Sequence, residues 1–231
     1  MENSSEERLA IFDLDGTILD TLDDLADALN HALTKSGYPE RSREEVCSFV
    51  GNGIRNLVAR GVPAGVREEA KEKVLADFND WYQVHCADKT RPYAGIPEFL
   101  AKLRSLGWRT AVVSNKADYG VQKLCSRYFD GLFDAAVGER ADVRRKPAPD
   151  SVYAVLRQLS AAKENAVYIG DSEVDLETAE NAGMACIAVC WGFRKESFLR
   201  ERGAQLLAVD VTELEEILLR GIPHVSGGRK D

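Results

Sequence analysis

The chain has 231 residues, 45% of them hydrophobic and 29% charged, and its formal net charge at pH 7 is −8. This length is enough for one or two domains with sizeable cores, while the negative charge argues against nucleic-acid binding through a broad basic surface. No segment approaches the roughly 18 consecutive apolar residues of a membrane span, and residues 1–7 do not resemble a signal peptide, so we expect a cytoplasmic protein without a membrane partner.

The first part of the chain is predicted to hold one strand followed only by helices. Residues 8–12 are largely apolar and predict a strand, after which the leucines of 20–36 recur at helical spacing. Further helices are predicted at 43–49, 53–60 and 66–85. The segment that follows the first strand is therefore expected to be an all-helical insert.

After residue 92, predicted helices and strands alternate along the chain. Helices are expected at 96–106, 119–128, 151–159, 174–182, 195–202 and 212–219, and strands at 110–114, 134–137, 166–169, 185–189 and 205–208. Such alternation is typical of a parallel sheet with helices on both faces. We predict an α/β fold, with a Rossmann-like core formed by 1–16 and 93–231 and a helical cap formed by 17–92. The tail, 226–231, is expected to be disordered.

Two aspartates, one residue apart, follow the first predicted strand directly. Strand alternation would send Asp13 and Asp15 to the same side, where two like charges resist ionising together unless a cation lies between them. Among divalent cations, Mg²⁺ suits oxygen ligands and a phosphate substrate. The end of this strand is therefore interpreted as a phosphoryl-transfer centre, and the alternative is a polar turn after an edge strand.

Three later segments supply what such a centre still needs. Ser114 and Asn115 follow a predicted strand, where a hydroxyl and exposed N–H groups can hold phosphate oxygens at a helix start. Lys146 precedes two prolines, which stiffen the chain and present the cation. Asp171 and Asp175 follow another predicted strand and would complete a metal site. Because ligands of open parallel sheets bind outside the carboxyl ends of the strands, we expect these segments to converge on one crevice.

The order of these segments resembles that of haloacid-dehalogenase superfamily hydrolases. The matching motifs are Asp13-Leu14-Asp15-Gly16-Thr17, Ser114-Asn115, Lys146-Pro147 and Gly170-Asp171-Ser172 followed by Asp175. Within that superfamily, four further segments are similar to phosphoglycolate phosphatases: residues 20–25, residues 49–55, Pro92-Tyr93-Ala94-Gly95 and Trp191-Gly192-Phe193. The resemblance implies a Mg²⁺-dependent phosphatase that hydrolyses a small phosphorylated metabolite, 2-phosphoglycolate first among the candidates, through an aspartyl-phosphate.

The resemblance also implies a role for each motif residue. Asp13 is the expected nucleophile and a metal ligand, and Asp15 is the expected general acid and base, whose backbone carbonyl also binds the metal. Asp171 is expected to be the second carboxylate ligand. Ser114, Asn115 and Lys146 are expected to bind the phosphate. Asp175 is expected to orient metal-bound water or Lys146 without binding the metal directly.

The predicted cap offers two candidate substrate-binding residues and does not identify the substrate. Arg55 and Asn52 either bind the carboxylate of the substrate or belong to a simple turn and a solvated helix face. A β-phosphoglucomutase or a pyrophosphatase of the same superfamily is the alternative enzyme. An inactive protein that binds a phosphorylated metabolite is the alternative outside catalysis. The sequence makes no prediction of oligomeric state.

Overall fold

The computed structural model describes residues 8–221, so the predicted disordered tail lies outside the described residues. Within them, six strands form a parallel sheet in the order β5-β4-β1-β6-β7-β8. Their bounds are β1 (Leu9–Phe12), β4 (Arg109–Ala117), β5 (Ala135–Glu139), β6 (Ala166–Gly170), β7 (Ala185–Val189) and β8 (Leu206–Ala208). The predicted α/β fold with a parallel sheet is therefore confirmed.

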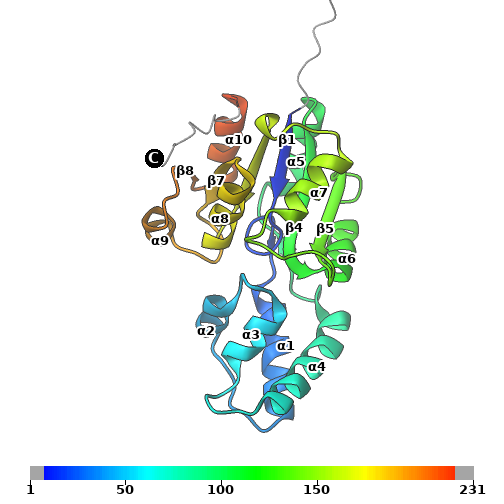
Figure 1. The fold of residues 1–231 in the computed structure, drawn as a ribbon, viewed down its shortest axis with the longest axis vertical. Helices are drawn as coiled ribbons and strands as arrows, with labels where there is room; N and C mark the ends of the chain where they lie inside the picture. Colours follow the sequence, from blue (N-terminus) through cyan, green and yellow to red (C-terminus); the bar gives the residue numbers. More distant parts are fainter. Residues whose placement is uncertain (1–7, 222–231) are drawn as a thin grey trace, which may run out of the picture.

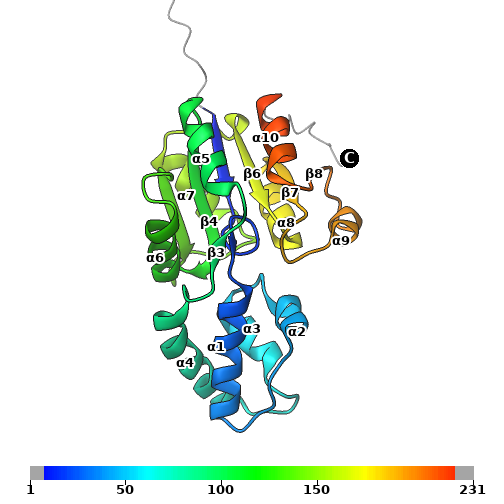
Figure 2. The same cartoon turned by 180° about the vertical axis from the view of Figure 1, so that it is seen from behind.

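The central strand, β1, explains why the sheet needs helices on both faces. All four of its residues are fully buried, as expected for a strand covered on both sides. Ala10 and Phe12 pack on the side of α5 (Ile96–Ser105), α6 (Asp118–Tyr128) and α10 (Val211–Leu219), whereas Leu9 and Ile11 pack on the side of α7 (Asp150–Gln158) and α8 (Glu173–Ala182). Figures 1 and 2 show these two helical layers from opposite sides.

The remaining helices before the second strand of the sheet form a separate group, called here the helical part. It consists of α1 (Leu22–Lys35), α2 (Arg43–Phe49), α3 (Gly53–Gly61) and α4 (Glu68–His85). These helices enclose their own apolar cluster, which includes Leu29, Val58 and Phe78. Figure 1 shows the helical part beyond the end of the sheet to which β1 points. Its boundaries as an independent domain stay a prediction.

Two differences from the predicted elements concern short stretches. β2 (Leu19–Asp20) and β3 (Arg91–Pro92) pair antiparallel where the chain enters and leaves the helical part, and two residues are too few to show an alternating pattern. β4 extends three residues beyond its predicted end, to Ala117, after a shift in register past Val113. A short 3₁₀ helix (Lys163–Asn165) and α9 (Glu196–Glu201) complete the described elements.

Across residues 8–221, no helix combines the length and apolar character that crossing a membrane requires.

Candidate active site

A cavity lies between the carboxyl ends of the central strands and the helical part. From the sheet side it is lined by Asp13, Asp15, Ser114, Asn115, Lys116, Lys146, Asp171, Ser172, Phe193 and Arg194. From the helical side it is lined by Leu25, Val50, Gly51, Gly53, Ile54 and Leu57. One wall is therefore charged and the other largely apolar. All four predicted motifs reach this cavity or the side chains directly behind it, because parallel strands end at the same edge of the sheet.

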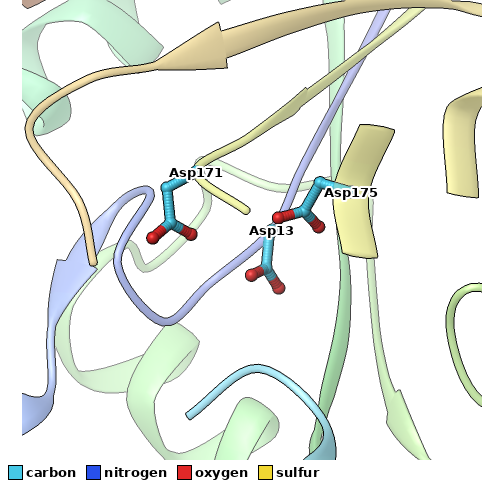
Figure 3. Close-up of side chains that lie close together, drawn as sticks. All are labelled: Asp13, Asp171 and Asp175. Atoms are coloured by element: carbon cyan, nitrogen blue, oxygen red, sulfur yellow. The ribbon is translucent and has the colours of Figure 1, made fainter. Parts of the chain in front are cut away.

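Three carboxylates gather where β1 and β6 end. Asp13, Asp171 and Asp175 each offer an oxygen, and these oxygens lie within 4.8 Å of one another (Figure 3). The close approach depends on Gly16, which has a φ of +86° and whose Cβ, if present, would lie 2.4 Å from Oδ2 of Asp171. A glycine thus meets both a backbone and a steric requirement in the first motif.

Asp171 is held firmly by groups on either side of it. The hydroxyl of Thr17 donates to its Oδ1 at 3.2 Å, and the backbone N–H of Phe193 donates to its Oδ2 at 2.7 Å. By contrast, Oδ1 of Asp13 pairs with the ammonium group of Lys146 at 2.9 Å and has no other polar partner among the described residues. Asp171 is therefore oriented by neutral hydrogen-bond donors, whereas Asp13 is held by the charge of Lys146.

Lys146 is a buried cation shared by two of the carboxylates. Its Nζ lies 2.9 Å from Oδ1 of Asp13 and 2.8 Å from Oδ1 of Asp175, and it also donates to the hydroxyl of Tyr168 at 3.0 Å. Asp175 in turn accepts hydrogen bonds from the backbone N–H and the hydroxyl of Ser172. Because these contacts engage both oxygens of Asp175, its clearest role in the structure is to orient Lys146.

Burial dominates the electrostatics of this cluster. Burial raises the pKa of Asp13 to about 7. Lys146 offsets only part of this rise, and repulsion from Asp175 and Asp15 adds to it. Burial, together with the charges of Asp175 and Asp13, also raises the pKa of Asp171 well above its usual value. Burial alone would lower the pKa of Lys146, but Asp13 and Asp175 outweigh it and raise that pKa above its usual value. A further positive charge close to Asp13 and Asp171 would lower both of these raised pKa values.

The charge balance of the site fits a divalent cation bound by oxygen. Four carboxylates, those of Asp13, Asp15, Asp171 and Asp175, share the region with two ammonium groups, those of Lys116 and Lys146. Arg194 does not change this balance, because it pairs with Glu173. When all four carboxyls are ionised, two negative charges remain without a cation among the described residues. Hard divalent cations prefer oxygen ligands of this kind.

Lys116 is a site residue to which the sequence interpretation gave no role. Its Nζ lies 3.0 Å from Oδ1 of Asp15 and 3.4 Å from Oδ2, and it also donates to the hydroxyl of Tyr82 in α4. Asp15 therefore does not join the triad of carboxylates, although alternation along the strand predicted a shared side. The reason is that β1 ends at Phe12, before the alternation could extend to Asp15. Lys116 follows Ser114-Asn115 directly, and this position was the available signal.

Ser114 and Asn115 both line the cavity, but they differ in the hydrogen bonds that they can still donate. The oxygen of Ser114 accepts a weak hydrogen bond from the backbone N–H of Lys116 at 3.3 Å, which leaves the hydroxyl hydrogen free to donate. The amide nitrogen of Asn115 donates to the backbone carbonyls of Gly51 at 3.2 Å and Lys146 at 3.0 Å. Asn115 thus connects the loop before α3 to the loop that carries Lys146.

The two predicted substrate contacts in the helical part do not line the cavity. The guanidinium of Arg55 pairs with Glu72, and its side chain is 60% exposed. Asn52 precedes α3, and its backbone carbonyl accepts a hydrogen bond from the side chain of Asn56. The residues of this segment that do line the cavity are Gly51, Gly53 and Ile54. In the described arrangement, Arg55 would have to leave Glu72 before it could reach a bound molecule.

Arg194 is a second site residue that sequence reasoning missed. Its Nε donates to Glu173 at 2.9 Å, and its terminal nitrogens donate to the backbone carbonyls of Cys47 at 3.1 Å and Val50 at 2.9 Å. These contacts join the loop after β7 to the end of α2. The signal was its position directly after Trp191-Gly192-Phe193, a segment already singled out by resemblance.

Comparisons with known proteins agree on one family. Residues 10–189 match the family model described as haloacid dehalogenase-like hydrolase. A phosphoglycolate phosphatase of Aquifex aeolicus is 34% identical over 189 residues, which cover 81% of this chain and 87% of that protein. A phosphoglycolate phosphatase of Mesorhizobium japonicum is 32% identical over 225 residues, which cover 94% of this chain and 98% of that protein.

Solved structures show the same fold. One from Lactobacillus delbrueckii subsp. bulgaricus has a TM-score of 0.88 and 38% identity, and covers 92% of this chain and 98% of its own. A predicted phosphoglycolate phosphatase from Haemophilus somnus has a TM-score of 0.86 and 26% identity, and covers 93% of this chain and 99% of its own. The similarity therefore extends over both the sheet and the helical part.

Proposed function

The chain belongs to the haloacid dehalogenase-like hydrolase family, and we propose that it is a Mg²⁺-dependent phosphatase that hydrolyses a small phosphate monoester, with 2-phosphoglycolate as the first candidate substrate. The observation that carries this proposal is the buried Asp13, which lies beside Lys146 and lines the same cavity as Ser114. The substrate is suggested by the names of the relatives from Aquifex aeolicus and Mesorhizobium japonicum.

Asp13 is the proposed nucleophile. Its carboxylate lines the cavity and lies beside Lys146, and one of its oxygens would attack phosphorus to form an aspartyl-phosphate. The bond between phosphorus and the leaving oxygen breaks, and the leaving oxygen takes a proton from Asp15. Water then attacks the aspartyl-phosphate, loses a proton to Asp15, and releases inorganic phosphate with Asp13 restored.

Positive charge and hydrogen-bond donors would hold the phosphate against the carboxylate that attacks it. Lys146 offers its charge beside Asp13, and Ser114 offers a free hydroxyl hydrogen. Asn115 contributes by fixing the backbone at Lys146 and Gly51. Mg²⁺, held by Asp13, Asp171 and the backbone carbonyl of Asp15, would supply the remaining positive charge when bound.

The helical part is the proposed cap, inserted as residues 17–92 between the halves of a core formed by 1–16 and 93–231. Its apolar side chains, Leu25, Ile54 and Leu57, form the wall opposite the charged groups. Such a cover excludes bulk water, which strengthens every charge interaction inside the site.

The test is Mg²⁺-dependent phosphate release from 2-phosphoglycolate, pyrophosphate and β-glucose 1-phosphate, with Asp13→Asn alongside. We expect the highest kcat/KM with 2-phosphoglycolate, no release in EDTA and none from the variant. Asp142→Asn, a change at an exposed aspartate, is the matched control and should keep full activity. Release by Asp13→Asn at the parent rate would exclude the covalent mechanism. Conversion of β-glucose 1-phosphate to an isomer, or preference for pyrophosphate, would favour the other enzymes of the superfamily, and binding without turnover would favour an inactive protein.

A further inference from the structure

We propose that Lys116 is a positioning residue for the second half of the reaction: together with Tyr82 of α4, it holds the Asp15 carboxylate ready to take a proton from the attacking water. This inference rests on the proposed function, because it assigns a partner to the base of that mechanism. It concerns a lysine distinct from Lys146, and a tyrosine that comes from the helical part and not from the sheet.

The ammonium group of Lys116 contacts one carboxylate, that of Asp15, and one hydroxyl, that of Tyr82. Its Nζ lies 3.0 Å and 3.4 Å from the two oxygens of Asp15 and donates to the hydroxyl of Tyr82. The side chain of Lys116 is 2% exposed and that of Asp15 is 14% exposed. Among the described residues, Lys116 is the only one whose side chain contacts the Asp15 carboxylate by a hydrogen bond or an ion pair. A cation this deeply buried is stable only with its partners in place.

Each of the two lysines in the site contacts a motif aspartate and a tyrosine hydroxyl, but the two tyrosines come from different parts of the fold. Lys146 contacts Asp13 and the hydroxyl of Tyr168, which lies on β6 within the sheet. Lys116 contacts Asp15 and the hydroxyl of Tyr82, which is buried in the apolar cluster of the helical part. Both tyrosines are almost fully buried, so each can hold its lysine in one position. Only the Lys116 arrangement depends on where the helical part sits.

The pairing matters most for the step in which Asp15 acts as a base. A base must offer a correctly placed oxygen to the water, and the contacts of Lys116 with both Asp15 oxygens fix where they lie. In that step water attacks phosphorus, the bond from phosphorus to the Asp13 oxygen breaks, and the proton passes from water to Asp15. Tyr82 reaches Lys116 from α4, so one of the contacts that hold the base comes from the helical part.

The kinetic test separates the two half-reactions in Lys116→Met. The kcat/KM reports the steps up to the aspartyl-phosphate, whereas kcat includes its hydrolysis. We expect kcat to fall by about ten- to a hundredfold, since acid–base groups contribute 10²–10⁴-fold and Asp15 itself remains. The value of kcat/KM should fall much less, and the acid-trapped aspartyl-phosphate should decay more slowly. Lys116→Arg should recover part of kcat because it restores the charge. Equal losses in kcat and kcat/KM, with no slower decay, would overturn the proposal.

A second measurement does not require activity. Tyr82→Phe removes one hydroxyl, and Tyr119→Phe removes the hydroxyl of a 40% exposed tyrosine as the matched control. In the metal-free protein, Lys116→Met and Tyr82→Phe should each speed hydrogen exchange in α4 while exchange in α5 stays unchanged. Tyr119→Phe should leave both helices unchanged. Unaltered exchange in α4 for both variants would overturn the link to the helical part. If the unmodified protein released no phosphate, the proposed function would fail, and exchange would still decide whether Lys116 joins Asp15 to α4.

Discussion

Asn in place of Asp13 should make the metal-free protein more stable at pH 8, even though it removes the nucleophile. Burial raises the pKa of Asp13 from 3.8 to about 7 in the fold. The folded state therefore binds a proton more tightly than the unfolded chain does, and the stability that this proton contributes is lost as the pH rises from about 4 through about 7. Asn cannot ionise, so Asp13→Asn does not lose stability in this window.

The magnitude follows from the same two pKa values. A difference of about three pH units, at about 1.4 kcal/mol for each, means that the ionised carboxylate costs the metal-free fold about 4 kcal/mol at pH 8. The variant also leaves Lys146 with Asp175 as its remaining ion-pair partner in the described site, which reduces the gain. We therefore expect the free energy of unfolding to rise by about 2–4 kcal/mol at pH 8 and to change little at pH 4.

The assay is urea unfolding in EDTA at pH 4, 6 and 8, followed by circular dichroism. Asp142→Asn, at an exposed position, serves as the control and should match the parent at each pH. Repeating the measurement at pH 8 with saturating Mg²⁺ should close the gap, because a cation that binds the folded parent stabilises it. A variant less stable than the parent in EDTA at pH 8 would refute the reasoning, since it would show that Lys146 stabilises the ionised Asp13 more than burial destabilises it.

Three further substitutions test other parts of the site. Lys146→Met should lower kcat/KM by about 10²–10³-fold, because it removes a cation aimed at the charge that develops on the phosphate; a change below tenfold would show that Lys146 does not face the phosphate. Gly16→Ala should lower the free energy of unfolding by about 1–3 kcal/mol and weaken Mg²⁺ binding in calorimetry, because its Cβ would meet the Asp171 carboxylate at a positive φ; unchanged Mg²⁺ affinity would contradict this. Arg55→Ala should leave KM for 2-phosphoglycolate within about twofold, because Arg55 is exposed and paired with Glu72, and a large rise in KM would restore its predicted contact with the substrate.

The sequence alone determined the sheet and the place of the site. Hydrophobic runs and helical spacing are local properties, so the strands and helices could be located within a few residues, and their alternation required a parallel sheet. Polar motifs directly after three of those strands then had to meet, since parallel strands end at one edge. Asp13, Ser114, Asn115, Lys146 and Asp171 accordingly line one cavity, with Asp175 behind Lys146.

Only the tertiary structure decided which charged group pairs with which. The partner of Asp15 is Lys116, which lies 101 positions further along the chain. The third member of that contact, Tyr82, comes from α4 of the helical part. Arg55 likewise pairs across two helices with Glu72, which no local pattern indicates. Such pairs depend on the direction in which each helix packs and on where the regular strand ends. A side chain's neighbours in space are fixed by the packing of distant segments, whereas its secondary structure is fixed largely by its neighbours in sequence.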